Sequence, residues 1–267
     1  MDYNIHLFLF TCYIIFGDVM KIYWEEMKPH EFKEALDAMP VAYLPLGTLE
    51  WHGYHMPLGA DGLQSKGLFE RVAKNIGGII MPMLFLGCDK KHIINDEEYY
   101  GMDVYNERRI SYYEPQKLMG SAYYIREELL EQILLQIISN VKRAGFKVLV
   151  AHGHGPSIKC FRSLKQKAYD LYQIQLVSPY DYIEDDLYAY QNDHAAANET
   201  SIMWALNEEL VDMRLCKEEK DLLAMIGRNP IEHASKEYGE EIIHKNVEAL
   251  CKGIKEIIIE FNSKYIL

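Results

Sequence analysis

The residues with the clearest chemical potential lie in one stretch, PLGTLEWHGYHMPLGAD, residues 45–61. Glu50 and His52 are two positions apart, so in extended backbone their side chains point to the same side, whereas Trp51 points away. A carboxylate beside an imidazole at a strand end can bind a transition-metal ion. Asp61 follows a turn rich in Gly and Pro. It either joins this metal site or caps the helix that we expect to begin there.

A second pair of candidates lies in AHGHGPS, residues 151–157, where His152 and His154 flank Gly153. The glycines indicate a loop chosen for its backbone conformation, with polar groups projecting from it. A histidine in such a loop can also be a purely structural residue. Of the two, His154 is the better candidate metal ligand, and we expect His152 to support the ligands without touching the ion.

The third cluster is NDHAAANETS, residues 192–201. His194 and Glu199 are five positions apart, which would place them about 140° apart around a single helix. We therefore expect His194 on the entry loop or first turn, and Glu199 inside the helix. The alternative is a plain helix start with a face of small residues for packing.

Strand and helix patterns alternate over residues 20–267, and no repeat or linker interrupts them. Apolar residues at helical spacing predict helices over residues 29–39, 61–78, 123–146, 157–172, 194–210 and 240–262. Short apolar runs predict strands over residues 41–47, 78–87, 147–155 and 173–183. This alternation predicts one α/β domain with a mostly parallel sheet and helices on both faces. Ligands bind such sheets beyond the carboxyl ends of the strands, where the first two clusters fall.

Composition excludes several classes of function. The chain has 267 residues, 49% of them hydrophobic, so it can bury a large core. Its net charge of −12 argues against nucleic-acid binding, which needs clustered Lys and Arg. The five cysteines are scattered and form no CxxC pair, which suits reduced thiols rather than disulfides or a zinc knuckle. We therefore expect a cytoplasmic protein.

The N-terminus is treated separately, because residues 5–17 are strongly apolar. This run is too short to span a bilayer comfortably, since a helix needs about 20 apolar residues. It also lacks the basic region and cleavage site of a signal peptide. Met20 begins a stretch that reads as an ordinary start. We expect residues 1–19 to be an apolar extension or a wrongly assigned start, with no membrane anchor, although a membrane-proximal role stays open.

Taken in order, the three motifs resemble the creatininase family of metal-dependent amidohydrolases. The family's first signature, P-x-G-S-x-E-Q-H-G-x-H-L-P-x-x-T-D, corresponds to PLGTLEWHGYHMPLGAD in this chain. Its second, NGHGGN, corresponds to HGHGPS, and its third, HAGxxETS, to HAAANETS. The resemblance runs from about residue 40 to 205 and more loosely to the end, and it implies the creatininase-like fold.

The resemblance also implies a ligand set. By position, Glu50 and His154 would bind one metal ion, His52 would bind the other, and Asp61 would bridge them. Creatininases carry a further glutamate two positions after the loop histidine, where this chain has Pro156. The resemblance makes Glu199 the natural replacement.

Two histidines receive other roles from the resemblance. His194 matches the family histidine that shuttles a proton, so it is the candidate catalytic residue. His55 matches a histidine near the site, and we expect it, like His152, to support the ligands.

The implied activity is hydrolysis of a C–N bond in a small cyclic amide or formamide by a water that two divalent ions activate. Ligands of N and O type suit zinc, manganese or iron, two ions per chain. Family members are typically hexameric, so we expect a homo-oligomer with a small-molecule amide as substrate. The tyrosine-rich segment 88–113 would form either a substrate loop or, as we favour, a subunit contact.

Three other functions are weighed against this one. A serine hydrolase is disfavoured because the chain has no G-x-S-x-G elbow. A two-metal phosphoesterase would need basic side chains near the site, for which Lys90, Lys91 and Arg126 are candidates. A non-catalytic member of the same fold is suggested by two departures from the family pattern: His152 replaces the usual asparagine, and residues 156–157 replace Gly-Asn.

Overall fold

The computed structural model describes residues 21–104, 111–183, 185 and 187–263. The expected apolar extension, residues 1–19, lies outside these ranges. Within them, no helix combines the length and the apolar character needed to cross a bilayer.

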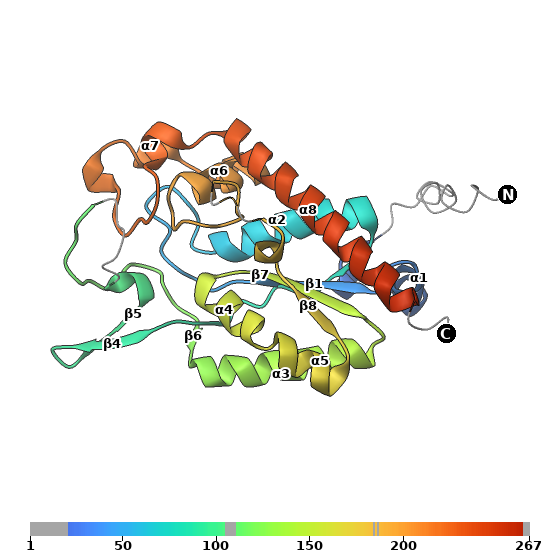
Figure 1. Ribbon diagram of the computed structural model, residues 1–267. Coiled ribbons are helices and arrows are strands. Elements are labelled where there is room, and N and C mark those ends of the chain that lie inside the picture. The colour runs from blue at the N-terminus through green and yellow to red at the C-terminus, as the bar shows by residue number, and fades with distance from the viewer. Residues whose placement is uncertain (1–20, 105–110, 184, 186, 264–267) are drawn as a thin grey trace.

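A parallel sheet lies at the centre of the domain, with its four strands in the order β2–β1–β7–β8 (Figure 1). The strands are β1 (Val41–Leu46), β2 (Ile79–Ile80), β7 (Val148–Gly153) and β8 (Gln175–Val177). Every residue of β1 and β7 is buried, because helices cover both faces of the sheet. The expected α/β class with a mostly parallel sheet is therefore confirmed.

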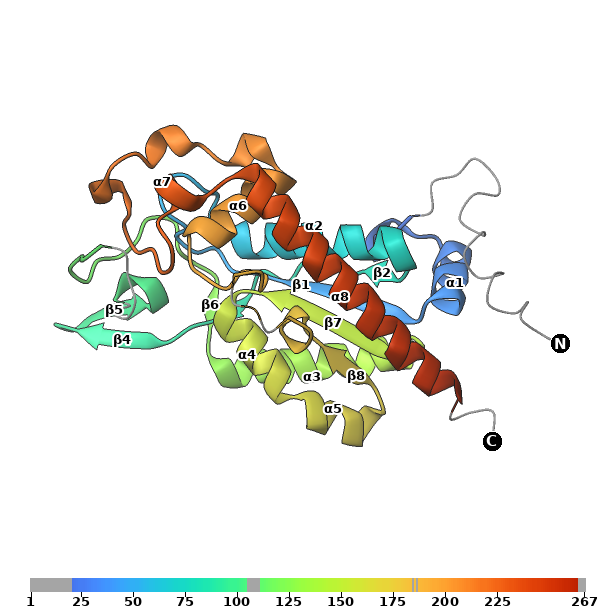
Figure 2. The ribbon, with the colours of Figure 1, turned by 45° about the horizontal axis from the view of Figure 1, so that its top comes forward.

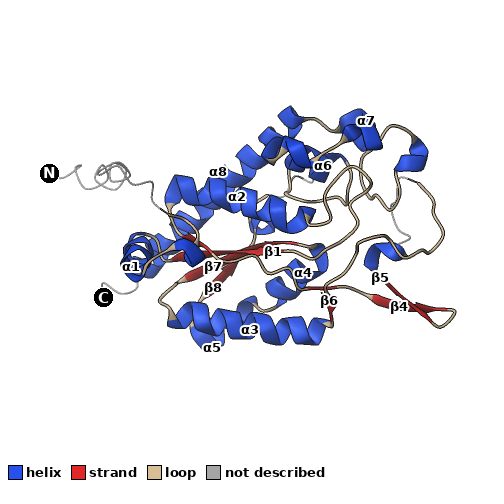
Figure 3. Ribbon diagram, turned by 180° about the vertical axis from the view of Figure 1, so that it is seen from behind, coloured by secondary structure: helices blue, strands red, loops and turns tan. Residues whose placement is uncertain are grey.

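Alternate residues of the two central strands serve opposite cores. Leu44 of β1 and Leu149 of β7 face a core closed by α3 (Glu127–Arg143), α4 (Gly155–Ser163) and α5 (Lys165–Tyr172). Tyr43 and Val150, their chain neighbours, face a core closed by α2 (Ala60–Ile76) and α8 (Lys236–Ser263). Figures 1 and 3 show these two helical layers on either side of the sheet, with α6 (Ala197–Leu206) beside α8.

The prediction of one strand over residues 78–87 is wrong for most of its length. Only Ile79–Ile80 joins the central sheet, and Gly87–Cys88 forms β3, which pairs with β6 (Tyr124–Ile125). Pro82 lies between the two short strands and cannot donate a backbone hydrogen bond. Because β6 takes Tyr124 and Ile125, helix α3 begins at Glu127 rather than at residue 123.

Two further segments are shorter than expected. The helix over residues 157–172 is divided into α4 and α5 at Leu164, whose side chain is buried in the core. The strand over residues 173–183 ends at Val177, since Pro179 opens a 3-10 turn, Pro179–Asp181.

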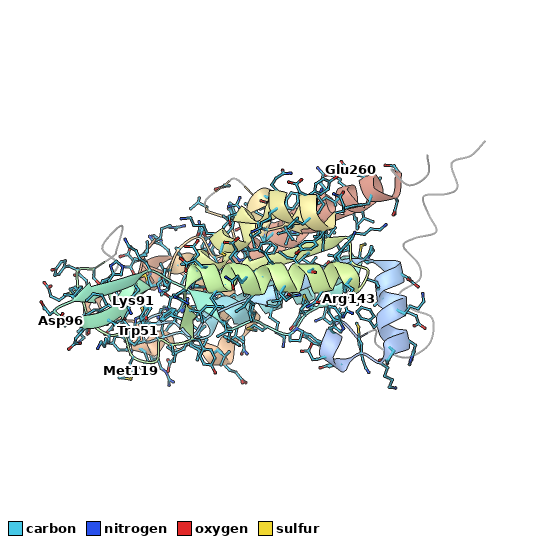
Figure 4. The ribbon with its side chains drawn as sticks, turned by 90° about the horizontal axis from the view of Figure 1, so that it is seen from below. Trp51, Lys91, Asp96, Met119, Arg143 and Glu260 are labelled. Carbon is cyan, nitrogen blue, oxygen red and sulfur yellow. The ribbon has the colours of Figure 1, made fainter. Side chains whose placement is uncertain are left out.

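A two-stranded hairpin projects from one end of the domain (Figure 2). It consists of β4 (Lys91–Ile94) and β5 (Glu97–Tyr100), joined by Asn95 and Asp96, both with positive φ. Two consecutive residues of positive φ give the tight turn that matches strand twist. Figure 4 shows Asp96 at the tip and Met119 at the same end of the molecule, opposite Arg143.

The remaining elements are α1 (Pro29–Ala38), α7 (Pro230–His233) and the 3-10 turns Trp24–Glu26, Gly101–Asp103, Glu208–Leu210, Met213–Leu215 and Glu219–Asp221.

The register of the sheet brings two of the polar motifs together. Leu46, the last residue of β1, pairs with Gly153, the last residue of β7. The loops that carry Glu50 and His154 therefore leave the sheet at the same edge. Gly153 has φ +143°, and a Cβ there would lie 1.7 Å from the Leu46 carbonyl oxygen, so only glycine permits this close approach.

Candidate metal centre

Glu50, Asp61 and His154 form the first group of candidate ligands, all three buried. His154 Nδ1 lies 3.1 Å from Glu50 Oε2 and 3.3 Å from Asp61 Oδ2. The other ring nitrogen, Nε2, lies 3.0 Å from the carbonyl oxygen of Cys88, to which it donates. A neutral imidazole has one N–H, so Nδ1 presents a lone pair to two carboxylate oxygens. That contact is favourable only with a proton or a cation among the three atoms.

His52, Asp61 and Glu199 form the second group. His52 Nδ1 donates to the carbonyl oxygen of Glu50, at 3.0 Å. In a neutral ring Nε2 would then carry the lone pair, and this atom lies 3.4 Å from Asp61 Oδ1 and 3.6 Å from Glu199 Oε2. Neither His52 Nε2 nor Asp61 Oδ2 has a hydrogen-bond partner among the described residues. Buried polar atoms without partners are rare, so one such atom in each ligand group fits a pair of cation-binding sites.

Asp61 belongs to both groups and is not the cap of the helix. Helix α2 begins at Ala60 with Gly59 as its N-cap, so Asp61 lies inside the first turn and does not cap it. Its two carboxylate oxygens face different histidines, Oδ1 toward His52 and Oδ2 toward His154.

His194 lies on the loop before α6, and Glu199 lies within that helix, as the five-residue spacing predicts. The His194 ring is 4.5 Å from the ring of His52. Its Nε2 donates to the carbonyl oxygen of Trp51 at 2.8 Å, which leaves Nδ1 with the lone pair. His194 can also offer a nitrogen within 4.8 Å of ligand atoms of Glu50 and His52.

The other two candidate histidines lie beside the ligand groups and not within them. His55 Nε2 contacts the hydroxyl of Thr200, the residue after Glu199, at 2.8 Å. Both nitrogens of His152 are engaged, Nε2 by the carbonyl oxygen of Tyr190 and Nδ1 by the N–H of Gly153. Burial lowers the pKa of each of these imidazoles to about 4, so both are neutral near pH 7.

Charge compensation explains the pKa values of the ligand groups. Burial opposes charge on His52, but Asp61 and Glu199 outweigh it and raise the pKa of His52 to about 10. Burial also opposes charge on His154, but Glu50 and Asp61 outweigh it and hold the pKa of His154 well above its usual range. These protons balance buried carboxylates. A divalent cation at the same atoms would replace them, because metal ligands must be deprotonated.

A cavity of about 300 Å³ opens onto both groups and is lined by Glu50, Asp61, His154, His194 and Glu199, together with Asp89, Asp193, Gln191, Met102 and Ile226. Among its lining residues, all from the described part of the chain, none is Lys or Arg. Of the three basic residues considered for phosphate binding, Lys90 and Arg126 are exposed, and Lys91 pairs with Glu98 on the hairpin.

Asp89 and Asp193 line this cavity, and the sequence motifs did not indicate them. Asp193 accepts hydrogen bonds from the N–H groups of Asn198, at 2.7 Å, and Glu199, at 3.0 Å, so it anchors the start of α6. Its position just before a predicted helix could have identified Asp193 as a helix cap. Asp89 follows directly after β3, and a correctly placed β3 would have been needed to find it.

The donor set fits divalent transition metals. Imidazole nitrogens and carboxylate oxygens suit zinc and manganese, and the two groups hold no thiolate. The residues expected from the motifs, Glu50, His52, Asp61, His154 and Glu199, all lie in these two groups.

Comparisons with known proteins give matches over much of the chain. A model of the creatininase family, described as creatinine amidohydrolase, matches residues 25–254. A creatinine amidohydrolase from Pseudomonas putida is 26% identical over 197 residues, which is 65% of this chain and 66% of the relative, slightly under two thirds of its length. A solved structure described as creatininase Mn has a TM-score of 0.63 at 22% identity, covering 88% of this chain and 98% of that one. A creatininase variant of Zn–Zn type has the same TM-score and coverage at 23% identity.

Proposed function

The chain belongs to the creatininase family, and on that premise we propose that it is a metal-dependent amidohydrolase that cleaves a C–N bond of a small cyclic amide or formamide. The observation that carries this proposal is the orientation of two buried imidazoles. His52 Nε2 and His154 Nδ1 each face carboxylate oxygens, because backbone carbonyls hold their opposite nitrogens. Backbone bonds that fix the tautomer of a ligating histidine are a regular feature of metal sites.

We assign the ligands to two ions. Glu50 and His154 would hold one ion, and His52 and Glu199 the other, with Asp61 shared because its two oxygens face the two histidines. When bound, such a pair of divalent cations polarises the scissile carbonyl and lowers the pKa of a water molecule. Zinc and manganese are the ions named for the related creatininase structures.

His194 is assigned the proton transfers. Burial lowers its pKa, although the charge of Glu50 partly offsets the effect, so the ring is neutral and can accept a proton. Trp51 holds the ring by its carbonyl oxygen, so Nδ1 is the nitrogen that exchanges the proton. An amide nitrogen is a poor leaving group, and the same nitrogen of His194 can return the proton to it.

The cavity favours a small substrate. Its volume of about 300 Å³ suits a single ring, and Met102 and Ile226 contribute apolar lining. Phosphate recognition is disfavoured, because the lining residues include no Lys or Arg.

Metal analysis combined with a substrate panel tests the proposal. We expect two ions per chain in protein purified without chelator, and hydrolysis of at least one member of a panel of lactams, creatinine and formamides. A protein that holds two ions but hydrolyses none of these compounds would contradict the activity. Retention of both ions in Glu50→Ala would contradict the ligand assignment. Glu97→Gln, which removes an exposed carboxylate paired with Lys117, is the matched control.

We also propose that the protein is a cytoplasmic homo-oligomer. The described cysteines, Cys88, Cys160, Cys216 and Cys251, are free thiols, which fits a reducing compartment. Ile93, in hairpin strand β4, is 60% exposed, and Met119, at the same end of the molecule in Figure 4, is 82% exposed. Large exposed apolar side chains gathered at one end are typical of a subunit contact.

A further inference from the structure

The carboxylate of Asp89 faces the cavity with one oxygen free. Asp89 Oδ1 accepts a hydrogen bond from the N–H of Lys90 at 2.6 Å. None of the described residues donates a hydrogen bond to Oδ2. His154 Nε2 lies 3.8 Å from Oδ2, but its N–H is already bound to the Cys88 carbonyl at 3.0 Å. The side chain is only 10% exposed, so Oδ2 has little access to water outside the cavity.

The chain is built to hold this carboxylate in place. Asp89 leaves the carboxyl end of β3, and Gly101 closes over it from the turn that follows β5. A Cβ on residue 101 would lie 2.0 Å from Asp89 Oδ2, and Gly101 has a positive φ of 42°. Only glycine lets the turn pack against the carboxylate, so the position of Asp89 depends on both segments.

Asp89 lies outside both ligand groups. It contacts the Nε2 edge of His154, whereas the first group gathers at the Nδ1 edge of that ring. Asp193, the other cavity carboxylate outside the ligand groups, already accepts hydrogen bonds from two backbone N–H groups. Of these two carboxylates, Asp89 is therefore the one with an oxygen that accepts no hydrogen bond from the described residues.

We propose that Asp89 selects the substrate, by binding a protonated amino group carried beside the scissile amide. This inference rests on the proposed hydrolase function and narrows its substrate class to amides that bear a cationic nitrogen. A largely buried carboxylate gains most from an ionised donor, because charge-assisted hydrogen bonds are stronger than neutral ones. The lining residues supply no competing Lys or Arg. An anionic substituent at the same place would face a second negative charge.

Three five-membered lactams test this selectivity, because they share one ring and differ in one substituent on the same carbon. The substituents are aminomethyl, hydroxymethyl and carboxylate, the last compound being pyroglutamate. Binding to metal-loaded protein is measured by calorimetry at a pH of about 8. An alkyl ammonium is still protonated there, and Asp89, whose pKa burial and the charge of Glu50 raise to about 7, is mostly ionised. Ring opening of each lactam is recorded separately.

We expect wild type to bind the aminomethyl lactam at least about tenfold more tightly than the hydroxymethyl lactam, and pyroglutamate most weakly. In Asp89→Asn the preference for the amine should fall below about threefold, while affinity for the hydroxymethyl lactam stays within a factor of two or so. Asp89→Ser should show the same loss, which guards against a misfolded variant. Glu97→Gln should keep the wild-type preference.

Several results would overturn the inference: equal binding of the three lactams by wild type, no binding of the aminomethyl lactam, or a preference that survives both Asp89 variants. Loss of bound metal from Asp89→Asn would overturn it too, since Asp89 would then be a ligand. The amine preference without any ring opening supports the Asp89 contact and counts against the hydrolase, so the two proposals fail separately.

Discussion

His154 Nδ1 lies 3.1 Å from Glu50 Oε2, and both side chains are buried. The contact joins the loops that follow the two central strands, so it exists only because those strands are neighbours. The carbonyl oxygen of Cys88 holds the opposite nitrogen, which means that a third segment selects the atom His154 offers to an ion.

Glu50→Gln should remove one ion and leave the other. The substitution keeps the shape of the side chain but removes the charge that the first ligand group needs. We expect about one ion per chain after desalting, and a loss of activity of about a thousandfold or more, because binuclear sites act as a unit. Elemental analysis by mass spectrometry measures the metal. Two ions retained in this variant would refute the assignment of Glu50.

Glu199→Gln and Asp193→Asn should separate metal binding from helix capping. Glu199 belongs to the second ligand group, so its variant should lose the ion shared with His52. Asp193 accepts hydrogen bonds from the first turn of α6, so its variant should keep both ions and lose about 1 kcal/mol of unfolding free energy. Metal content and denaturant unfolding check the pair. Loss of an ion from Asp193→Asn, with both ions retained in Glu199→Gln, would show that Asp193 is the ligand and Glu199 is not.

His55 should make stability depend on pH on the acid side. Burial, reinforced by the charge of His52, lowers the folded pKa of His55 to about 4 from its ordinary value of 6.5. As the pH falls, His55 therefore takes up its proton in the unfolded chain before it does so in the folded protein. The contribution of His55 is fully present above pH 6.5 and is lost progressively between pH 6.5 and about 4, on the order of 3 kcal/mol in all.

His55→Gln removes the titrating group while keeping a polar side chain beside Thr200. Urea unfolding of wild type and variant from pH 8 to 4 should show a shallower acid decline in the variant. Parallel curves for the two proteins would show that His55 does not carry the effect.

Removing the ions should lower the melting temperature. An ion present at about a hundred times its dissociation constant stabilises the folded state by about 2.7 kcal/mol. For a chain of this size that corresponds to a loss of about 5–10 °C on chelation. Scanning calorimetry with and without chelator measures the shift, and Glu199→Gln should show a smaller one. An unchanged melting temperature in wild type would speak against tight metal binding.

The assembly prediction can be checked by light scattering. A hexamer of the 31.1 kDa chain is expected on family grounds, with the hairpin end as the contact. Met119→Lys places a charge on a side chain that is 82% exposed, and should weaken such a contact without unfolding the chain. A monomeric mass for wild type would contradict the prediction. A mass unaffected by Met119→Lys would place the contact elsewhere.

Local patterns were enough to predict much of the fold. The four-residue recurrence of apolar positions identified α3, and short apolar runs identified β1 and β7, because burial on one or both faces leaves a periodic trace in the chain. The errors have local causes too. The run at residues 78–87 is apolar because it is partly buried, yet Pro82 keeps it from forming one strand.

The sequence by itself determined which residue types were available for metal chemistry, in motifs specific enough to identify the family. Tertiary structure decided which atoms face one another: that Asp61 meets both His52 and His154, that backbone carbonyls turn the lone pairs of these imidazoles inward, and that Asp89 opens into the same cavity. The reason is geometric. Periodicity records whether a side chain is buried, but side-chain contacts across distant segments depend on strand register and loop closure, and these leave no periodic trace.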